Sequence, residues 1–126
     1  MMKSAWLALP MVVWTAPAMA QPAQTAEENL IGHYYLQGVM ETGSELLLRP
    51  DGRFQWYLSY GALDLFAEGT WRVAGDAVEL VAAPSVDVPK PGFERLSLAI
   101  AGAGLIPPDG RGAYVRARED GETAPD

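Results

Sequence analysis

The chain has 126 residues and no cysteine, and its 16 acidic side chains outnumber the 9 basic ones to give a net charge of −7. Without cysteine there are no disulfides, no thiol nucleophile and no thiolate metal ligands. A negative net charge disfavours nucleic acid and anionic membranes as partners, because both attract clustered lysine and arginine. The length suits one small domain that depends on its apolar core.

Residues 1–20 have the three-part layout of a secretory signal peptide. Lys3 supplies the basic region, an apolar stretch follows, and the small residues Ala18 and Ala20 predict cleavage after Ala20. An uncleaved anchor helix is disfavoured, because a membrane span needs about 20 consecutive apolar residues and Pro10 interrupts this shorter stretch. We therefore expect an exported protein, periplasmic or secreted, with no stable membrane anchor after cleavage. The mature chain would carry eight basic and 16 acidic residues, a net charge of −8.

After the cleavage site, the sequence divides into a leader, one domain and a tail. Residues 21–29 are polar and aperiodic, which is typical of a flexible leader. Residues 118–126 form a mostly polar tail, and we expect them to be disordered. Between them, residues 30–117 alternate apolar and polar side chains and lack the spacing of an amphipathic helix. This pattern predicts an all-β domain, with room for one short helical turn in residues 28–32.

The segment LLLRPDGRFQW, residues 46–56, indicates a tight hairpin. Its central Pro-Asp-Gly suits a type I turn followed by a residue in the left-handed region. A three-residue loop of this kind sets Leu48 opposite Phe54 and Leu46 opposite Trp56, so one face of the hairpin is apolar.

The segment WRVAGDAVEL, which begins at Trp71, indicates a second hairpin. Its central Gly-Asp is a two-residue loop with glycine in the position that a type II′ turn requires. The resulting register sets Trp71 opposite Leu80 on one face and Arg72 opposite Glu79 on the other. Since the register of each hairpin places its apolar residues on one face, residues 44–82 are predicted to form an antiparallel meander of four strands.

The segments on either side extend this meander. Residues 31–40 alternate and predict one further strand, whereas residues 83–94 contain three prolines and predict a loop or an edge segment. Residues 95–100 alternate again, and residues 112–117 are predicted to return against them. The predicted fold class is therefore all-β, an antiparallel up-and-down meander of about six to eight strands that forms a small barrel or half-barrel.

The connection GALDLF, residues 61–66, leaves the register of its hairpin open. In one register Tyr60 faces Ala67 across all six residues. In the other, Tyr60 faces Leu65 across GALD alone, and Phe66 points outward.

The run GSELLLRPDGRFQWYLSYGALDLFAEGTWRVAGDAVEL resembles lipocalin-like envelope proteins, notably the META domain and the copper-resistance type of stress lipoprotein. The resemblance rests on a strand, a Pro/Asp-Gly turn, an aromatic strand, and a G-x-W strand followed by a Gly-Asp turn. The matching residues are Asp51, Gly52, Phe54, Gly69, Trp71, Gly75, Asp76 and Leu80. The resemblance implies an up-and-down barrel that holds an apolar ligand. The copper-resistance type also carries a Cys-x-x-Cys and a lipidated N-terminus, so its metal and redox functions are not implied for this cysteine-free chain.

Five aromatic side chains share the predicted inner face and form the candidate ligand site: Tyr34, Phe54, Trp56, Tyr60 and Trp71. Around a cavity they would form an apolar lining with phenol groups that orient a ligand. Alternatively they fill the interior, because a barrel of about eight strands is just wide enough for side chains to close it. The many large apolar residues on the same face favour the filled interior.

Other polar and aromatic residues are candidates for surface roles. Asp64 is expected to cap its turn, and an exposed Phe66 beside it would indicate a contact surface. His33 is the only histidine, and we expect it to point outward from a strand. Arg49 is predicted to lie opposite Arg53, and since like charges across a ladder are unfavourable, both should turn to solvent or pair with nearby carboxylates.

No combination of residues indicates catalysis, a metal site or a cofactor. A single histidine supports neither a catalytic triad nor a zinc site, and no pattern places Asp64 and Glu68 around a cleft as an acid and base. We expect a non-enzymatic binding module that holds a small apolar ligand. The alternatives are an envelope protein-interaction module that uses its outer face with Tyr35 and Tyr57, and, least favoured, a hydrolytic enzyme.

Overall fold

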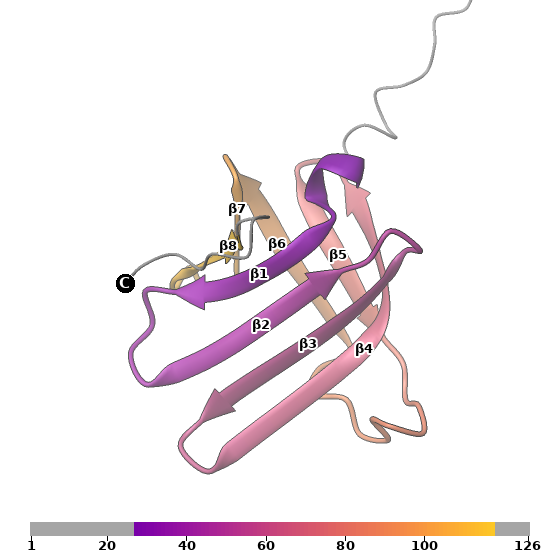
Figure 1. Cartoon of the computed structure of the whole chain (residues 1–126), viewed down its shortest axis with the longest axis vertical. Coiled ribbons are helices and arrows are strands. Elements are labelled where there is room, and N and C mark those ends of the chain that lie inside the picture. Colours follow the sequence, from indigo (N-terminus) through magenta and orange to yellow (C-terminus); the bar gives the residue numbers. More distant parts are fainter. Residues whose placement is uncertain (1–26, 118–126) are drawn as a thin grey trace, which may run out of the picture.

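The computed structural model describes residues 27–117, and these form one closed β-barrel (Figure 1). Its strands are β1 (Gly32–Gln37), β2 (Thr42–Leu48), β3 (Arg53–Tyr60), β4 (Leu63–Ala74), β5 (Ala77–Ala82), β6 (Arg95–Ala101), β7 (Gly104–Ile106) and β8 (Ala113–Arg116). Each strand pairs antiparallel with the next, and β8 closes the barrel on β1. The predicted all-β up-and-down meander is confirmed, as a closed barrel. The predicted signal peptide, residues 1–20, and the predicted tail, residues 118–126, lie outside the described residues.

The alternation of side chains along the strands produces the core. Successive residues of a strand point to opposite faces, so every second side chain enters the barrel. The buried apolar residues follow this rule: Tyr34, Leu46, Leu48, Phe54, Trp56, Ala67, Trp71, Val78, Leu80, Leu98, Leu105 and Tyr114. The barrel interior is therefore the hydrophobic core, and the alternating polar residues cover its outer surface.

Both predicted tight hairpins are confirmed in register. Leu48 pairs with Phe54 across the β2–β3 loop, where Gly52 has φ of 83°. Trp71 pairs with Leu80 across the β4–β5 loop, where Gly75 has φ of 64°. Positive φ at these two positions is the conformation that the turn types require, and glycine adopts it without a steric penalty. Local backbone chemistry thus sets the register of four strands.

Both predicted registers of the β3–β4 hairpin are wrong. Tyr60 pairs with Leu63, so the connection is only Gly61 and Ala62, and Leu63 to Phe66 belong to β4. A two-residue loop needs positive φ at its first position, which Gly61 supplies with φ of 61°. The observed register is displaced by two residues from the nearer prediction. A displacement of two keeps every side chain on its face, so the hydrophobic pattern cannot detect it.

The C-terminal strands also depart from the prediction. Residues 95–101 pair with β7, whose three residues lie within the AGAGLIPP segment, and not with residues 112–117. The latter contain β8, which pairs with β7 and β1. A three-residue strand between glycines and prolines is too short to show alternation, which explains why the sequence pattern does not reveal it.

Residues 83–94 form a loop, in agreement with their prolines, and this loop follows the free edge of β4. β4 pairs with β5 only from Gly69 onward. Before that point the loop supplies hydrogen bonds, from Ala83 N–H to the Glu68 carbonyl at 3.0 Å and from Gly92 N–H to the Phe66 carbonyl at 2.8 Å. The loop therefore completes the wall of the barrel between β4 and β6.

One end of the barrel is covered by a helical turn of residues 27–30, which includes three residues of the predicted flexible leader. The Tyr34 hydroxyl donates to the Leu30 carbonyl at 2.7 Å, and Arg116 donates to the Ile31 carbonyl at 3.1 Å. Leu30 and Ile31 pack against the core. No helix within residues 27–117 has both the length and the apolar character needed to cross a membrane. The turn and its contacts define the covered end of the barrel.

Candidate ligand cavity

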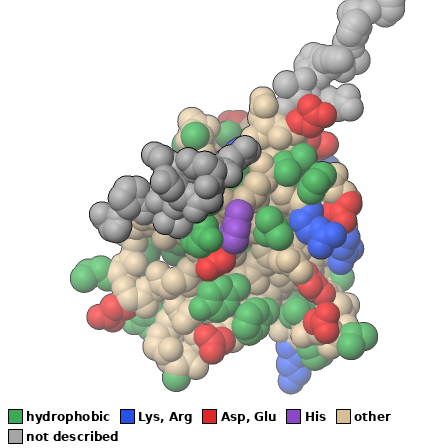
Figure 2. All heavy atoms as spheres, in the orientation of Figure 1, with side chains coloured by type: hydrophobic (Ala, Val, Ile, Leu, Met, Phe, Trp, Pro, Cys, Tyr) green, Lys and Arg blue, Asp and Glu red, His purple; other side chains and the backbone are tan. Residues whose placement is uncertain are grey.

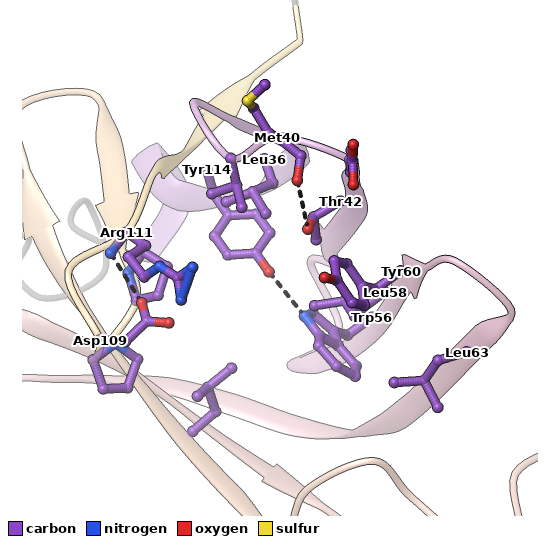
Figure 3. A pocket seen from close by; sticks show the side chains of 15 residues that line it. Leu36, Met40, Thr42, Trp56, Leu58, Tyr60, Leu63, Asp109, Arg111 and Tyr114 are labelled. Carbon is purple, nitrogen blue, oxygen red and sulfur yellow. Dashed lines mark hydrogen bonds between the residues drawn. The ribbon is translucent and has the colours of Figure 1, made fainter.

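A cavity of about 870 Å³ opens at the end of the barrel opposite the helical turn (Figure 3). The β1–β2 turn, the β3–β4 hairpin and the β7–β8 connection surround its mouth, and β6 contributes Leu96. Most of its lining is apolar, including Leu36, Val39, Trp56, Leu58 and Tyr114. The barrel is thus a cup, covered at one end and open at the other.

The aromatic residues predicted for the site separate into two groups. Tyr34 and Phe54 are fully buried and Trp71 is 8% exposed, and none of the three borders the cavity. They fill the covered half of the barrel. Trp56 and Tyr60 line the cavity in the open half. A filled interior and a hollow one therefore coexist in one barrel.

The assignment of Tyr60 to the interior is wrong. Its side chain is 56% exposed, although it shares the inward face of β3 with Trp56 and Leu58. Tyr60 is the last residue of β3, where the hairpin reaches the mouth of the cup. Because Tyr60 lies on the inward face of β3 but at the end of the strand, its ring is on the rim of the cavity instead of in the core.

A chain of hydrogen bonds crosses the floor of the cavity. Ser44 donates its hydroxyl proton to the Tyr57 carbonyl at 2.6 Å. Its oxygen therefore accepts from the Tyr114 hydroxyl at 2.8 Å, and Tyr114 in turn accepts the indole N–H of Trp56 at 3.1 Å. Figure 3 shows the Trp56–Tyr114 bond at the base of the cavity. Every donor in this chain has a partner, so the floor is polar in composition but has no free donor.

Tyr114 is the site residue that the sequence pattern does not identify. It is 3% exposed and lines the cavity from β8. The sequence signal is the alternation of Ala113, Tyr114, Val115 and Arg116, which is too short to assign one face to the interior. Its role emerges only when β8 closes the barrel against β1.

The mouth of the cup carries an apolar collar. Met40 is 80% exposed and Leu63 is 49% exposed, and both line the cavity together with Tyr60. Single exposed apolar side chains are common on protein surfaces and need no explanation. A group of them around an opening, in contrast, is typical of a binding site. The collar therefore continues the apolar lining out to the solvent.

The outer face of β1 to β4 carries a second, smaller groove of about 300 Å³. Tyr57 and Phe66 stack there with ring centroids 5.5 Å apart, and His33 stacks on Tyr35 at 4.6 Å. His33 also lies 3.0 Å from a Glu45 carboxylate oxygen, which agrees with its predicted outward position. Figure 2 shows the histidine on this face among apolar and acidic side chains.

The predicted surface residues lie at the edge of this outer face. Phe66 is 49% exposed, and Asp64, two residues before it on β4, is also exposed. The predicted capping of a turn by Asp64 is not seen, because Asp64 pairs with Ser59 within the strands. Arg49 pairs with Asp51 at 2.9 Å, so a carboxylate neutralises one of the two facing arginines.

Fold and cavity together define the class of molecule: an eight-stranded antiparallel barrel, covered at one end, with an apolar cavity at the other. No family model matches the chain, and no curated protein or solved structure matches it. Its own geometry is therefore the basis for assigning a function.

Proposed function

We propose that this chain is an exported, non-enzymatic binding protein whose barrel holds a small apolar ligand in the open cavity. The observation that carries the proposal is the cavity itself, whose volume of about 870 Å³ lies within the range of roughly 300–1,000 Å³ typical of ligand sites. Its lining is mainly apolar, and the hydrogen-bonded floor needs nothing from a ligand. Apolar contact would then be the main source of affinity.

Export is proposed from the N-terminal sequence, and the lipocalin-like resemblance supports the same assignment. The mass of the protein purified from its native host tests the cleavage site. A chain that begins at Gln21 is the expected result, and a chain that retains residues 1–20 would contradict it. The same measurement in native conditions detects any ligand that remains bound through purification.

The two tryptophans of the barrel make the cavity testable by fluorescence. Trp56 borders the cavity, whereas Trp71 lies in the covered half with its N–H bonded to the Arg49 carbonyl at 3.0 Å. We would titrate the protein lacking residues 1–20 with N-phenyl-1-naphthylamine, a neutral apolar probe. In the Trp71→Phe variant the emission of Trp56 should change and saturate. In the Trp56→Phe variant the emission of Trp71 should change much less.

Filling the cavity provides the matched control. Leu58→Trp adds bulk to the lining, and Gln55→Trp adds the same bulk to the outer face of the same strand. We expect the first variant to lose probe binding and the second to keep it, with similar melting temperatures. Equal probe binding by both variants would contradict the proposal.

The outer face supports a second candidate function, contact with another envelope protein. The specific observation is the Tyr57–Phe66 stack, because Phe66 remains 49% exposed at the rim of the outer groove. Association with a defined envelope partner should weaken in a Phe66→Ser variant and persist in Leu58→Trp. The reverse pattern would assign that association to the cavity.

A further inference from the structure

The floor of the cavity determines which end of a ligand enters first. The donors of Trp56, Tyr114 and Ser44 are all used within the floor chain. Within residues 27–117, no buried side-chain nitrogen or oxygen lacks a hydrogen-bond partner. A ligand carboxylate, which only accepts hydrogen bonds, therefore finds no donor at the floor, and burying it there without a partner is unfavourable. Apolar atoms of an anionic ligand then lie at the floor, and its anionic group lies at the mouth.

Charged side chains are confined to the mouth of the cavity. Three lining residues carry charge: Glu41 on the β1–β2 turn, and Asp109 and Arg111 on the β7–β8 connection. Glu41 has φ of 59° and is the only residue other than glycine with positive φ among residues 27–117. Backbone strain of this kind often accompanies functional positions.

Arg111 is held on an ordered turn beside the opening. The Asp109 carboxylate accepts the backbone N–H of Arg111 at 2.9 Å, and Gly110 donates its N–H to the Pro107 carbonyl at 2.9 Å. Figure 3 shows Arg111 beside Asp109 among the residues that line the cavity. The turn therefore holds the backbone of Arg111 at the mouth of the cavity, where a polar head group of a ligand would lie.

The guanidinium group of Arg111 has no hydrogen-bond or ion-pair partner within the described part of the chain. In contrast, Arg72 pairs with Glu79 at 2.9 Å, and Arg116 donates to the carbonyl of Ile31. A guanidinium presents its N–H donors in a planar fork, which matches the two oxygens of a carboxylate. Arg111 is thus the one cationic side chain in the lining of the mouth, and no residue among 27–117 pairs with its guanidinium group.

From these observations we propose that the cavity selects an amphiphile with an apolar tail and a single carboxylate head, and that Arg111 is the residue that recognises this head. The assignment rests on the proposed function, since it concerns the same cavity. A head with two negative charges is disfavoured because Glu41 and Asp109 stand at the same mouth and would repel the second charge. Arg111 is therefore a specificity-determining residue.

Two displacement series test the assignment. N-phenyl-1-naphthylamine bound to the protein lacking residues 1–20 is displaced either by dodecanoate or by dodecanol, which share one chain length and differ in the charged head. We expect Arg111→Gln to lower the affinity for dodecanoate about five-fold, the size of one favourable surface ion pair. The affinity for dodecanol and for the probe should not change.

Three further variants separate recognition from a structural role. Arg111→Lys keeps the charge and should retain part of the preference for dodecanoate. Glu41→Gln removes a repelling charge and should raise the affinity for dodecanoate about two-fold. Arg53→Gln changes an exposed arginine next to the β2–β3 loop, at the covered end, and should change neither affinity.

The outcomes distinguish this assignment from the function on which it rests. A wild-type protein that does not bind N-phenyl-1-naphthylamine saturably would overturn both. If the probe binds but dodecanoate and dodecanol lose affinity equally in Arg111→Gln, Arg111 is not the head-group contact and only this assignment is overturned. An unchanged dodecanoate affinity in that variant would overturn it as well.

Discussion

Trp56 and Trp71 lie on the inner face of neighbouring strands, but only Trp56 borders the cavity. The indole N–H of Trp56 is donated to the Tyr114 hydroxyl at 3.1 Å, in the floor. The indole N–H of Trp71 is donated to the Arg49 carbonyl at 3.0 Å, beside the β2–β3 loop. The two rings therefore mark the boundary between the filled half of the barrel and the hollow half, and they should respond differently to mutation and to ligand.

Tyr114→Phe tests the floor chain. Removing the hydroxyl leaves the buried N–H of Trp56 without its acceptor, and an unsatisfied buried donor costs about 1–3 kcal/mol. We expect the free energy of unfolding, measured by urea denaturation, to fall by about this amount. Tyr60→Phe removes an exposed hydroxyl of the same type at the rim and should change stability by less than about 0.5 kcal/mol. Equal effects of the two substitutions would contradict the hydrogen-bonded floor.

Trp71→Ala tests the filled half. Trp71 is 8% exposed within the core, and truncating a large buried aromatic costs about 3–5 kcal/mol. This is a large share of a typical domain stability of about 5–15 kcal/mol. We expect a strongly lowered melting temperature by circular dichroism. An unchanged melting temperature would contradict the position of Trp71 in the core.

Gly69→Ala tests the close approach of β4 and β5. A Cβ at Gly69 would clash with the Val81 carbonyl oxygen, so the strands would have to separate. Overpacking of this kind costs about 1–3 kcal/mol or more. Gly43→Ala is the control, because a Cβ there meets no atom within 4 Å. The first variant should unfold at lower urea concentration than the second, and similar midpoints would show that the strands yield without cost.

The sequence predicts the strand pairing correctly where the turn residues and the alternation of apolar side chains indicate the same register. Gly52 and Gly75 have the positive φ that their turns require, and the four strands around them have the predicted pairs. The alternation of side chains alone is a weaker guide to strand register, because a displacement of two residues leaves every side chain on the same face of the sheet. For this reason the sequence pattern does not predict the pairing of Tyr60 with Leu63.

The candidate site was predictable only in part. The pattern identifies Trp56 because this residue belongs to a long alternating strand. It does not identify Tyr114 and Arg111, because they lie in short segments whose positions depend on the closure of β8 against β1. Barrel closure joins residues that are far apart in sequence, such as Ser44 and Tyr114, and no local pattern encodes that contact.

The Tyr34 phenol, at the covered end of the barrel, makes the stability of the protein depend on pH in the alkaline range. Burial raises the pKa of the Tyr34 phenol above its ordinary value of 10.0, and the nearby Arg116 offsets only part of this effect. Because the folded pKa is higher than the unfolded one, the native protein favours the neutral phenol. That stabilisation is complete below pH 10.0 and is lost as the pH rises through the folded pKa.

The expected result is a steeper loss of stability in the wild-type protein than in Tyr34→Phe when urea midpoints at about pH 9 and about pH 11 are compared. Tyr34→Phe should itself be less stable at the lower pH, because it loses the hydrogen bond to the Leu30 carbonyl at 2.7 Å. Tyr60→Phe, which removes an exposed phenol, should keep the wild-type dependence on pH. If Tyr34→Phe also keeps that dependence, the neutral phenol does not hold the helical turn against the barrel.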